Sequence, residues 1–146
     1  MDTRGRLVDV LELPGFIAEN DGIWIGYLSY ENRVGNIEVI ALEALVKGQG
    51  VGSALLARCV QAALAEDARR VWLLTSNDNT AALRFYQWRG FALVAVHRDA
   101  ITRARETLKP EIPLVGMDAI PLRDEIELEL PRSIWLDFIE RYSWPT

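Results

Sequence analysis

The residues best suited to chemistry in this chain are three glycines at every second position, Gly48, Gly50 and Gly52. They lie between an apolar run typical of a strand and Val51–Ala68, where apolar side chains recur at helical spacing. Glycine lets a ligand approach the backbone closely and permits backbone angles that other residues avoid. Unpaired N–H groups and the positive end of the helix dipole meet at a helix N-terminus and favour anions. The stretch predicts a pyrophosphate site, although a glycine-rich turn that merely joins strand to helix is the alternative.

Composition limits the class of protein. The chain has 146 residues, enough for one core, and its formal charge of −5 argues against non-specific nucleic-acid binding. No leader-like apolar segment follows Met1–Arg6, and no run approaches the roughly 18 apolar residues of a membrane span. The single cysteine, Cys59, excludes an intrachain disulfide and lies on an apolar helical stripe, so we expect a core residue in a reducing cytoplasm. With His97 it provides too few soft ligands for a zinc site, and we expect no metal.

The elements before the glycines read as an antiparallel meander. Phe16–Glu19 and Ile23–Tyr30 flank Asn20-Asp21-Gly22, which is a hairpin signature. A second polar turn at residues 32–36 leads to a third strand, Ile37–Val46, which runs directly into the glycines.

After the first helix the pattern alternates between strand and helix. Val71–Thr75 is a short apolar run, and a helix followed by such a strand predicts a right-handed parallel crossover. Residues 76–79 contain good N-capping side chains for a second helix, Thr80–Arg89, which Gly90 is placed to end in a left-handed conformation. Phe91–His97 reads as the next strand.

The last third of the chain adds an insertion and a final helix. Residues 99–121 read as a short polar helix followed by a loop rich in proline. Arg123–Leu130 alternates strictly, which predicts a half-exposed strand with a charged outer face. In the C-terminal segment 131–146, Ser133 is placed to cap a helix that packs on its own domain or, alternatively, forms a homodimer contact.

Two familiar phosphate loops fit the glycines poorly. A Walker A motif needs Lys and then Ser or Thr after its second glycine, whereas Ser53 follows Gly52 directly. A Rossmann fingerprint needs Gly-x-Gly-x-x-Gly after a leading parallel strand, whereas here the preceding strand closes a meander. A Rossmann-type nucleotide-binding module is therefore disfavoured.

Lys47-Gly48-Gln49-Gly50-Val51-Gly52 resembles the acetyl-CoA pyrophosphate loop, Arg/Gln-x-x-Gly-x-Gly/Ala, of the GNAT superfamily of N-acetyltransferases. Residues 79–91, from Asn79 through Ala82 and Tyr86 to Gly90-Phe91, are similar to its second motif, Asn-x-x-Ala-x-x-x-Tyr-x-x-x-Gly-Phe. The likeness extends over residues 16–130, with a tail shared by a bacterial subgroup of uncertain substrate. It implies a single GNAT-like α/β (α+β) domain over residues 1–146. The expected fold is a mixed, largely antiparallel sheet with a central parallel pair and flanking helices.

Two departures from the family pattern matter. Lys47 stands where Arg or Gln is usual, so it keeps a positive charge but loses the planar fork. The superfamily usually begins with a strand and two helices that help to build the acceptor pocket, whereas only the short segment 1–15 precedes Phe16 here. Either the 99–121 insertion or a partner subunit completes that pocket, or the pocket is open. A CoA-binding regulatory or interaction module without catalysis is the rival hypothesis.

The resemblance implies acetyl-CoA as cosubstrate and assigns its binding residues. The pantetheine is expected to lie along the strand edge before the glycines. The pyrophosphate is expected on the backbone amides of the loop. The start of the second helix is expected to contact the pantetheine arm. The residues so assigned are Leu45, Val46, Lys47, Gly48, Gln49, Gly50, Val51, Gly52, Ser53, Asn79, Ala82 and Phe85.

Acetyl transfer to a primary amine of a small molecule or peptide needs a proton donor for the departing thiolate and help in obtaining a neutral amine. Tyr86 lies one helical turn beyond Ala82, and its phenol is a proton donor at neutral pH; the alternative is a core aromatic with a satisfied hydroxyl. Glu38 matches the position where some members carry the base. Glu43, five residues away, is expected on the opposite face of the strand, and His97 is a generic candidate. Water or the substrate itself is the remaining alternative for the base.

The charges of the late segments leave the acceptor undecided. A basic group formed by Arg98, Arg103, Arg105 and Lys109 reads as a solvated helix face or as a site for an acidic acceptor or the CoA 3′-phosphate. An acidic stripe formed by Asp124, Glu125, Glu127 and Glu129 would instead suit a cationic amine.

Overall fold

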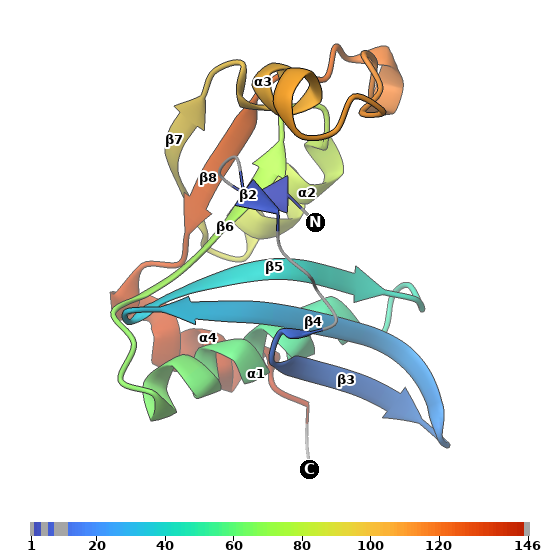
Figure 1. The fold of residues 1–146 in the computed structure, drawn as a ribbon. Coiled ribbons are helices and arrows are strands. Elements are labelled where there is room, and N and C mark those ends of the chain that lie inside the picture. Colours follow the sequence, from blue (N-terminus) through green and yellow to red (C-terminus); the bar gives the residue numbers. More distant parts are fainter. Residues whose placement is uncertain (1, 4–5, 8–11, 145–146) are drawn as a thin grey trace. The chain divides into compact units, whose positions relative to one another are not determined.

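The computed structural model describes residues 2–3, 6–7 and 12–144, so part of the N-terminal segment 1–15 lies outside the described residues (Figure 1). In chain order the elements are β1 (Asp2–Thr3), β2 (Arg6–Leu7), β3 (Gly15–Asn20), β4 (Ile23–Arg33), β5 (Asn36–Ala44), α1 (Val51–Ala65), β6 (Arg70–Ser76), α2 (Thr80–Trp88), β7 (Ala92–His97), α3 (Ala100–Thr107), the 3-10 helix η2 (Met117–Ala119), β8 (Glu125–Glu129), the 3-10 helix η3 (Arg132–Ile134) and α4 (Trp135–Tyr142).

Six strands form one sheet in the order β3-β4-β5-β6-β8-β7, and β1 pairs with β2 separately. The pairs β3–β4, β4–β5 and β7–β8 are antiparallel. The connection from β5 through α1 to the neighbouring β6 is the crossover that a parallel pair requires. The predicted mixed, largely antiparallel sheet with one parallel pair is confirmed.

The chain divides into two compact units. One, here called the meander unit, comprises Val10–Trp72 and Leu130–Thr146; the other, here called the α2 unit, comprises Met1–Asp9 and Leu73–Glu129. The strand β6 begins in the first unit and ends in the second. None of the described helices is long and apolar enough to cross a lipid bilayer.

In the meander unit two tight turns join β3, β4 and β5. Asp21 and Gly22 have φ values of 52° and 79°, and Val34 and Gly35 have values of 54° and 83°. Positive φ at both central residues is typical of the type I′ turns that match the twist of a hairpin. The predicted meander is therefore confirmed, with its strands shifted by only a few residues at their ends.

Helix α1 packs on all three strands of the meander and contributes many of the buried side chains of this unit. Cys59 is fully buried on α1, as predicted, and burial raises the pKa of its thiol to about 12. The helix ends three residues earlier than predicted, at Ala65, because Asp67 adopts a left-handed φ of 55° that cannot continue a helix. Other buried side chains of this core are Leu28, Ile37, Val39, Leu55, Leu56, Val60, Val71 and Leu130.

The C-terminal helix α4 packs on α1 within the same unit, which confirms the first of the two predictions for it. Trp135 and Phe138 are buried, and the Trp135 indole N–H donates to the carbonyl of Leu130 at 3.0 Å. The predicted Ser133 cap is wrong. The 3-10 helix η3 intervenes, so the N-cap is Ile134 and no side chain caps the helix.

A bulge in β5 changes which way its two glutamates point. Ile40 is the extra residue where the β4–β5 register shifts. Glu38 pairs with Glu31 and Glu43 pairs with Tyr27, and these two partners are four residues apart on β4. Because cross-strand partners share a face, Glu38 and Glu43 lie on the same face of the sheet. The prediction that they point to opposite faces is wrong, since the bulge shifts the alternation by one residue.

In the α2 unit, β7 follows α2 in the chain and pairs antiparallel with β8. The Asn79 side chain caps α2 by accepting the N–H of Ala82 at 3.0 Å, and Gly90 follows the helix with a φ of 105°, as predicted. The charged outer face predicted for β8 is wrong in part, because Glu127 is only 3% exposed. Its Oε1 lies 2.9 Å from Nε2 of His97 on β7.

Candidate functional site

The predicted site residues fall into two groups, one in each unit. The residues from Leu45 to Ser53 follow β5 and begin α1, together with Glu38 and Glu43 on β5, in the meander unit. The residues Asn79, Ala82, Phe85 and Tyr86 belong to the start and middle of α2 in the other unit.

The glycine bend uses the conformational freedom that its sequence predicts. Gly48 and Gly50 have φ values of 76° and 71°, in the left-handed region that side chains disfavour. A Cβ on Gly48 would meet no atom within 4 Å, and one on Gly50 would meet only the Trp144 indole nitrogen, at 3.7 Å. The outer side of the bend therefore has open space in front of its backbone.

The start of α1 carries the donors expected of an anion site. The first helical bond runs from the N–H of Ala54 to the carbonyl of Gly50 at 2.9 Å. The N–H groups of Val51 and Gly52 donate no hydrogen bond to any residue that the structure describes. The first turn contains no acidic residue, and no side chain caps it. The N–H groups of Val51 and Gly52 and the positive end of the α1 dipole are therefore available to an anion, since no carboxylate of the first turn competes for them.

The strand edge before the glycines has fewer free backbone groups for a ligand than the sequence predicts. β5 ends at Ala44 rather than at Val46, and the N–H of Leu45 already donates to the carbonyl of Ile25 at 2.8 Å. Leu45 therefore keeps only its carbonyl for pairing with a ligand amide. Its side chain is 55% exposed, whereas that of Val46 is half-buried.

On α2 the capping bond uses the Asn79 side-chain carbonyl, which leaves the NH₂ group of this side chain as the donor available to a ligand. Tyr86 is half-buried, with ring contacts to Phe85 at 5.2 Å and Phe91 at 5.3 Å between centroids. Among the described residues none forms a hydrogen bond with the Tyr86 hydroxyl. Burial raises the pKa of Tyr86 to about 12, so the phenol stays protonated at neutral pH.

The three candidate bases differ in burial. Glu38 is 4% exposed, whereas Glu43 is exposed on the same face. His97 is half-buried and bound to Glu127 through Nε2. No cluster of three or more His, Cys, Asp or Glu side chains able to hold a metal ion occurs within residues 2–3, 6–7 and 12–144.

Sequence reasoning missed the anchors that hold the 99–121 insertion, because it read residues 76–79 only as a helix cap. Asp78 is buried; its Oδ2 accepts the N–H of Met117 at 2.8 Å, while its buried Oδ1 has no partner among the described residues. The Asn77 side chain donates to the carbonyl of Pro121 at 2.8 Å and accepts the N–H of Asp124 at 3.0 Å. The insertion is thereby tied to the residues that precede Asn79.

Replacing Gly116 by Ala is expected to lower the free energy of unfolding by about 1–3 kcal/mol, the usual cost of overpacking. A Cβ at this position would overlap Oδ2 of Asp78 and lie 2.6 Å from its Cγ. Urea unfolding would measure the effect. Because the clash involves the Asp78 carboxylate, Gly116→Ala should cost much less when Asp78→Ala is also present; an equal cost in both backgrounds would contradict this explanation.

Asp124 links the start of β8 to the residue before α3. Its Oδ1 accepts the N–H of Asp99 at 2.8 Å, and its Oδ2 accepts from Nε of Arg123 at 2.9 Å. Burial alone would raise the pKa of this carboxyl. The hydrogen bonds from Asp99 and Arg123, with the charges of Arg123 and Arg98, outweigh burial and lower the pKa below its ordinary value of 3.8.

Replacing Asp124 by Asn is expected to destabilise the protein at neutral pH and progressively less in acid. A lowered folded-state pKa gives stability that is present above the unfolded-state pKa and is lost as the pH falls through the folded-state pKa. Unfolding curves of both proteins from about pH 7 to about pH 3 would show the difference shrinking. Asp137→Asn, on the exposed surface of α4, is the control; a pH-independent difference for Asp124→Asn would overturn the assignment.

The model of the acetyltransferase (GNAT) family matches residues 6–91, which include the glycine bend, α1 and α2. This chain belongs to the GNAT family. It is 41% identical over 116 residues to the uncharacterized protein YdhI of Bacillus subtilis (strain 168), covering 79% of this GNAT chain and 72% of YdhI. Over 118 residues it is 36% identical to the uncharacterized protein YxbD of the same organism, covering 80% of the chain and 74% of YxbD.

Solved structures share the GNAT fold at low sequence identity. An IAA acetyltransferase from Bacillus cereus ATCC 14579 has a TM-score of 0.66 and 24% identity, covering 78% of this chain and 74% of its own. A GNAT family acetyltransferase from Elizabethkingia anophelis, solved with acetyl-CoA bound, has a TM-score of 0.68 and 20% identity, covering 78% and 72%.

Proposed function

We propose that this GNAT protein transfers the acetyl group of acetyl-CoA to a primary amine of a small molecule or peptide, by direct attack in a ternary complex. The observation that carries the proposal is the start of α1, where Val51 and Gly52 present N–H groups behind two left-handed glycines and no acidic residue competes. Such a helix start suits a pyrophosphate. Membership of the GNAT family and a structural relative with acetyl-CoA bound support acetyl-CoA as the molecule that carries this pyrophosphate.

The residues of the two family motifs bind different parts of acetyl-CoA. The bend from Lys47 to Ser53 binds the pyrophosphate, with Lys47 as a point charge rather than a fork. Leu45 and Val46 contribute backbone groups to the pantetheine, and the Leu45 carbonyl is the group left for this role. Asn79, Ala82 and Phe85 contact the pantetheine arm.

The chemistry then needs two proton transfers. The neutral amine nitrogen forms a bond to the thioester carbon, the carbon–sulfur bond breaks, and the thiolate of CoA takes the Tyr86 phenolic proton. The proton that the amine nitrogen loses passes to Glu38, directly or through water. The Tyr86 hydroxyl bonds to no described residue, and its raised pKa of about 12 keeps it protonated at neutral pH, although that same pKa makes the phenol a weaker acid than the thiol it would protonate.

The test of the function is release of the CoA thiol from acetyl-CoA across a panel of primary amines, with calorimetric titration of CoA alongside. Amine-dependent release supports the proposal. Tight CoA binding without release on any amine would instead favour a CoA-binding module that lacks catalysis. Absence of CoA binding would exclude both.

Replacing Glu38 by Gln is expected to slow transfer about 10²- to 10⁴-fold near pH 7, the usual contribution of a general base. An alkylamine has a pKa near 10.4, so the deficit should shrink as rising pH supplies neutral amine directly. Glu43→Gln is the matched control, because Glu43 lies on the same face of β5 but is exposed. Equal rates for Glu38→Gln and the parent at every pH would remove Glu38 from the mechanism.

A further inference from the structure

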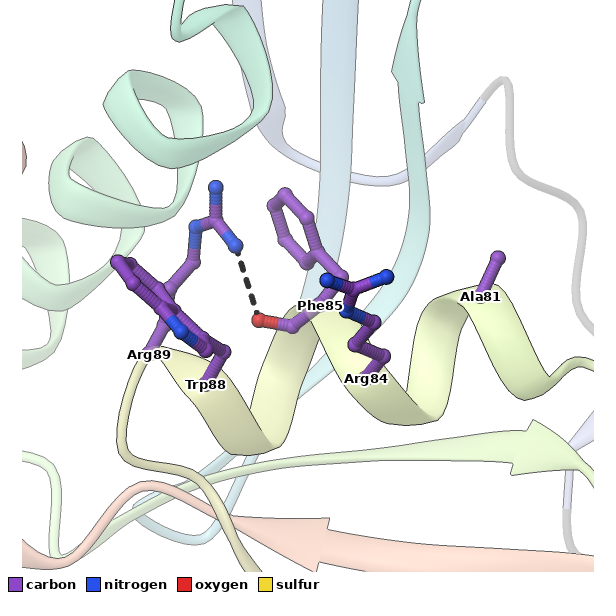
Figure 2. Close-up of a pocket in the computed structure, with 5 residues that line it drawn as sticks. All are labelled: Ala81, Arg84, Phe85, Trp88 and Arg89. Carbon is purple, nitrogen blue, oxygen red and sulfur yellow. Dashed lines mark hydrogen bonds between the residues drawn. The ribbon is translucent and has the colours of Figure 1, made fainter.

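Each unit has a cavity, and the two cavities differ in the number of segments that build them. The cavity of the α2 unit, about 400 Å³, is lined by residues of α2 and by its C-cap, Arg89. The Arg89 guanidinium lies 3.7 Å from the centroid of the Phe85 ring and donates to the Phe85 carbonyl at 3.0 Å (Figure 2). This cavity is therefore the face of a single helix, and one of its cations is already engaged there.

The cavity of the meander unit, here called the meander cavity, is built from three segments and encloses about 430 Å³. It is lined by residues 16–19 of β3, by Leu55, Arg58 and Gln61 of α1, and by Ser143 and Trp144 after α4. All of these residues belong to the meander unit, and none of them was assigned to acetyl-CoA or to catalysis. The meander cavity therefore has no role in the proposed acetyl transfer.

The walls of the meander cavity are largely apolar and partly aromatic. Leu55 and Ala18 are buried, Phe16 is half-buried, and the Trp144 side chain is 40% exposed. Cavities of about 300–1,000 Å³ with mostly apolar walls and a few polar groups are typical sites for small molecules. The exposed indole of Trp144 provides a flat surface on which an aromatic ring can pack.

Arg58 brings a positive charge to this cavity. Leu55, Arg58 and Gln61 share one face of α1 because they are three residues apart. Arg58 donates from Nη1 to Oε1 of Gln61 at 3.2 Å, and its guanidinium lies 5.1 Å from the centroid of the Phe16 ring. Nε2 of Gln61 in turn donates to Oγ of Ser143 at 3.5 Å. None of the described residues forms an ion pair with Arg58, so the other donors of its planar fork are available to a carboxylate.

The acidic residue of the lining, Glu19, does not neutralise this charge. It follows the buried Ala18 on β3, and successive side chains of a strand point to opposite faces. The extra residue of the β3–β4 bulge is Ile25 on β4, so the alternation along β3 continues. Glu19 is therefore directed to the face of β3 opposite Phe16, which lies against Arg58. The charge on the α1 side of the cavity is positive and favours an anion.

We propose that the meander cavity is a binding site for a small aromatic carboxylate. The carboxylate pairs with the Arg58 guanidinium, and the aromatic ring packs against Leu55 and Trp144. Because Gln61 and Phe16 already orient the guanidinium, little side-chain entropy is lost when the ligand binds.

Calorimetric titration of the full chain with phenylacetate and with its neutral isostere phenylacetamide tests the role of charge. The parent should bind phenylacetate with a Kd of about 1 mM or tighter, as expected for a ligand of about ten non-hydrogen atoms, and phenylacetamide more weakly. Arg58→Gln should weaken phenylacetate binding roughly tenfold and leave phenylacetamide binding unchanged, the size expected for a lost hydrogen bond between charged groups. Arg141→Gln, which removes an exposed arginine from α4, is the charge-matched control and should change neither.

Tryptophan fluorescence locates the bound ring. Phenylacetate should change the emission of the parent protein. Trp144→Phe should remove most of that change and keep most of the affinity, because phenylalanine retains an aromatic face. Trp88→Phe, which removes an exposed indole from α2, is the matched control and should leave the fluorescence change intact.

The inference is overturned if phenylacetate shows no saturable binding up to about 10 mM, a concentration well above the expected Kd. It is also overturned if Arg58→Gln weakens both ligands equally, or if the fluorescence change survives in Trp144→Phe. Thermal unfolding of each variant checks the fold, which replacement of the exposed Arg58 is not expected to affect. A parallel titration with acetyl-CoA keeps the two proposals apart, since its binding neither requires nor excludes a ligand in the meander cavity.

Discussion

Replacing Gln49 by Glu is expected to weaken acetyl-CoA binding at least tenfold without lowering stability. Gln49 is exposed and precedes Gly50, the N-cap of α1. A carboxylate there opposes the pyrophosphate at short range, and tenfold corresponds to only about 1.4 kcal/mol. The same carboxylate interacts favourably with the helix dipole, by about 0.3–1 kcal/mol, so the melting temperature should stay level or rise. Opposite signs for affinity and stability distinguish a lost anion site from a damaged fold.

Calorimetry with acetyl-CoA and thermal unfolding measure the two effects of Gln49→Glu. Gln61→Glu is the control, because it adds the same charge on α1, about three turns beyond residue 49. The affinity deficit should shrink as salt screens the repulsion. Unchanged affinity at low salt would show that the pyrophosphate does not bind at the glycine bend, and the functional proposal would lose its foundation.

Replacing Tyr86 by Phe is expected to lower kcat by about 10²- to 10⁴-fold, the range for a general acid, while acetyl-CoA affinity stays the same. The phenol makes no described hydrogen bond, so its removal should leave stability unchanged. Burial raises the pKa of Tyr86 to about 12, which keeps the phenol protonated below that pH. Loss of the Tyr86 proton therefore should not reduce the rate of the parent enzyme anywhere between about pH 6 and pH 10.

Steady-state rates and acetyl-CoA titrations of the parent and Tyr86→Phe test this role. Tyr142→Phe on α4 provides a comparison in which a tyrosine hydroxyl is lost from the other unit. Equal kcat in Tyr86→Phe and the parent would show that water or another group protonates the thiolate.

Much of the candidate site follows from short-range patterns in the chain. Glycine at residues 48 and 50 provides the two left-handed positions, and the change from strand to helix spacing places the start of α1 at Val51. The Asn79 cap and the positive φ of Gly90 likewise delimit α2 to within a residue. Such features are readable because the interactions that create them lie within a few residues of one another.

The tertiary structure decided what depends on partners far along the chain. The faces of Glu38 and Glu43 follow from a bulge that arises only when β5 pairs with β4, and the Leu45 N–H is taken by Ile25 on that same strand. The burial of Glu127 beside β7 could not be read from alternation within β8. A sequence pattern specifies which side chains share a face of one element, but packing and pairing between elements decide which face meets water.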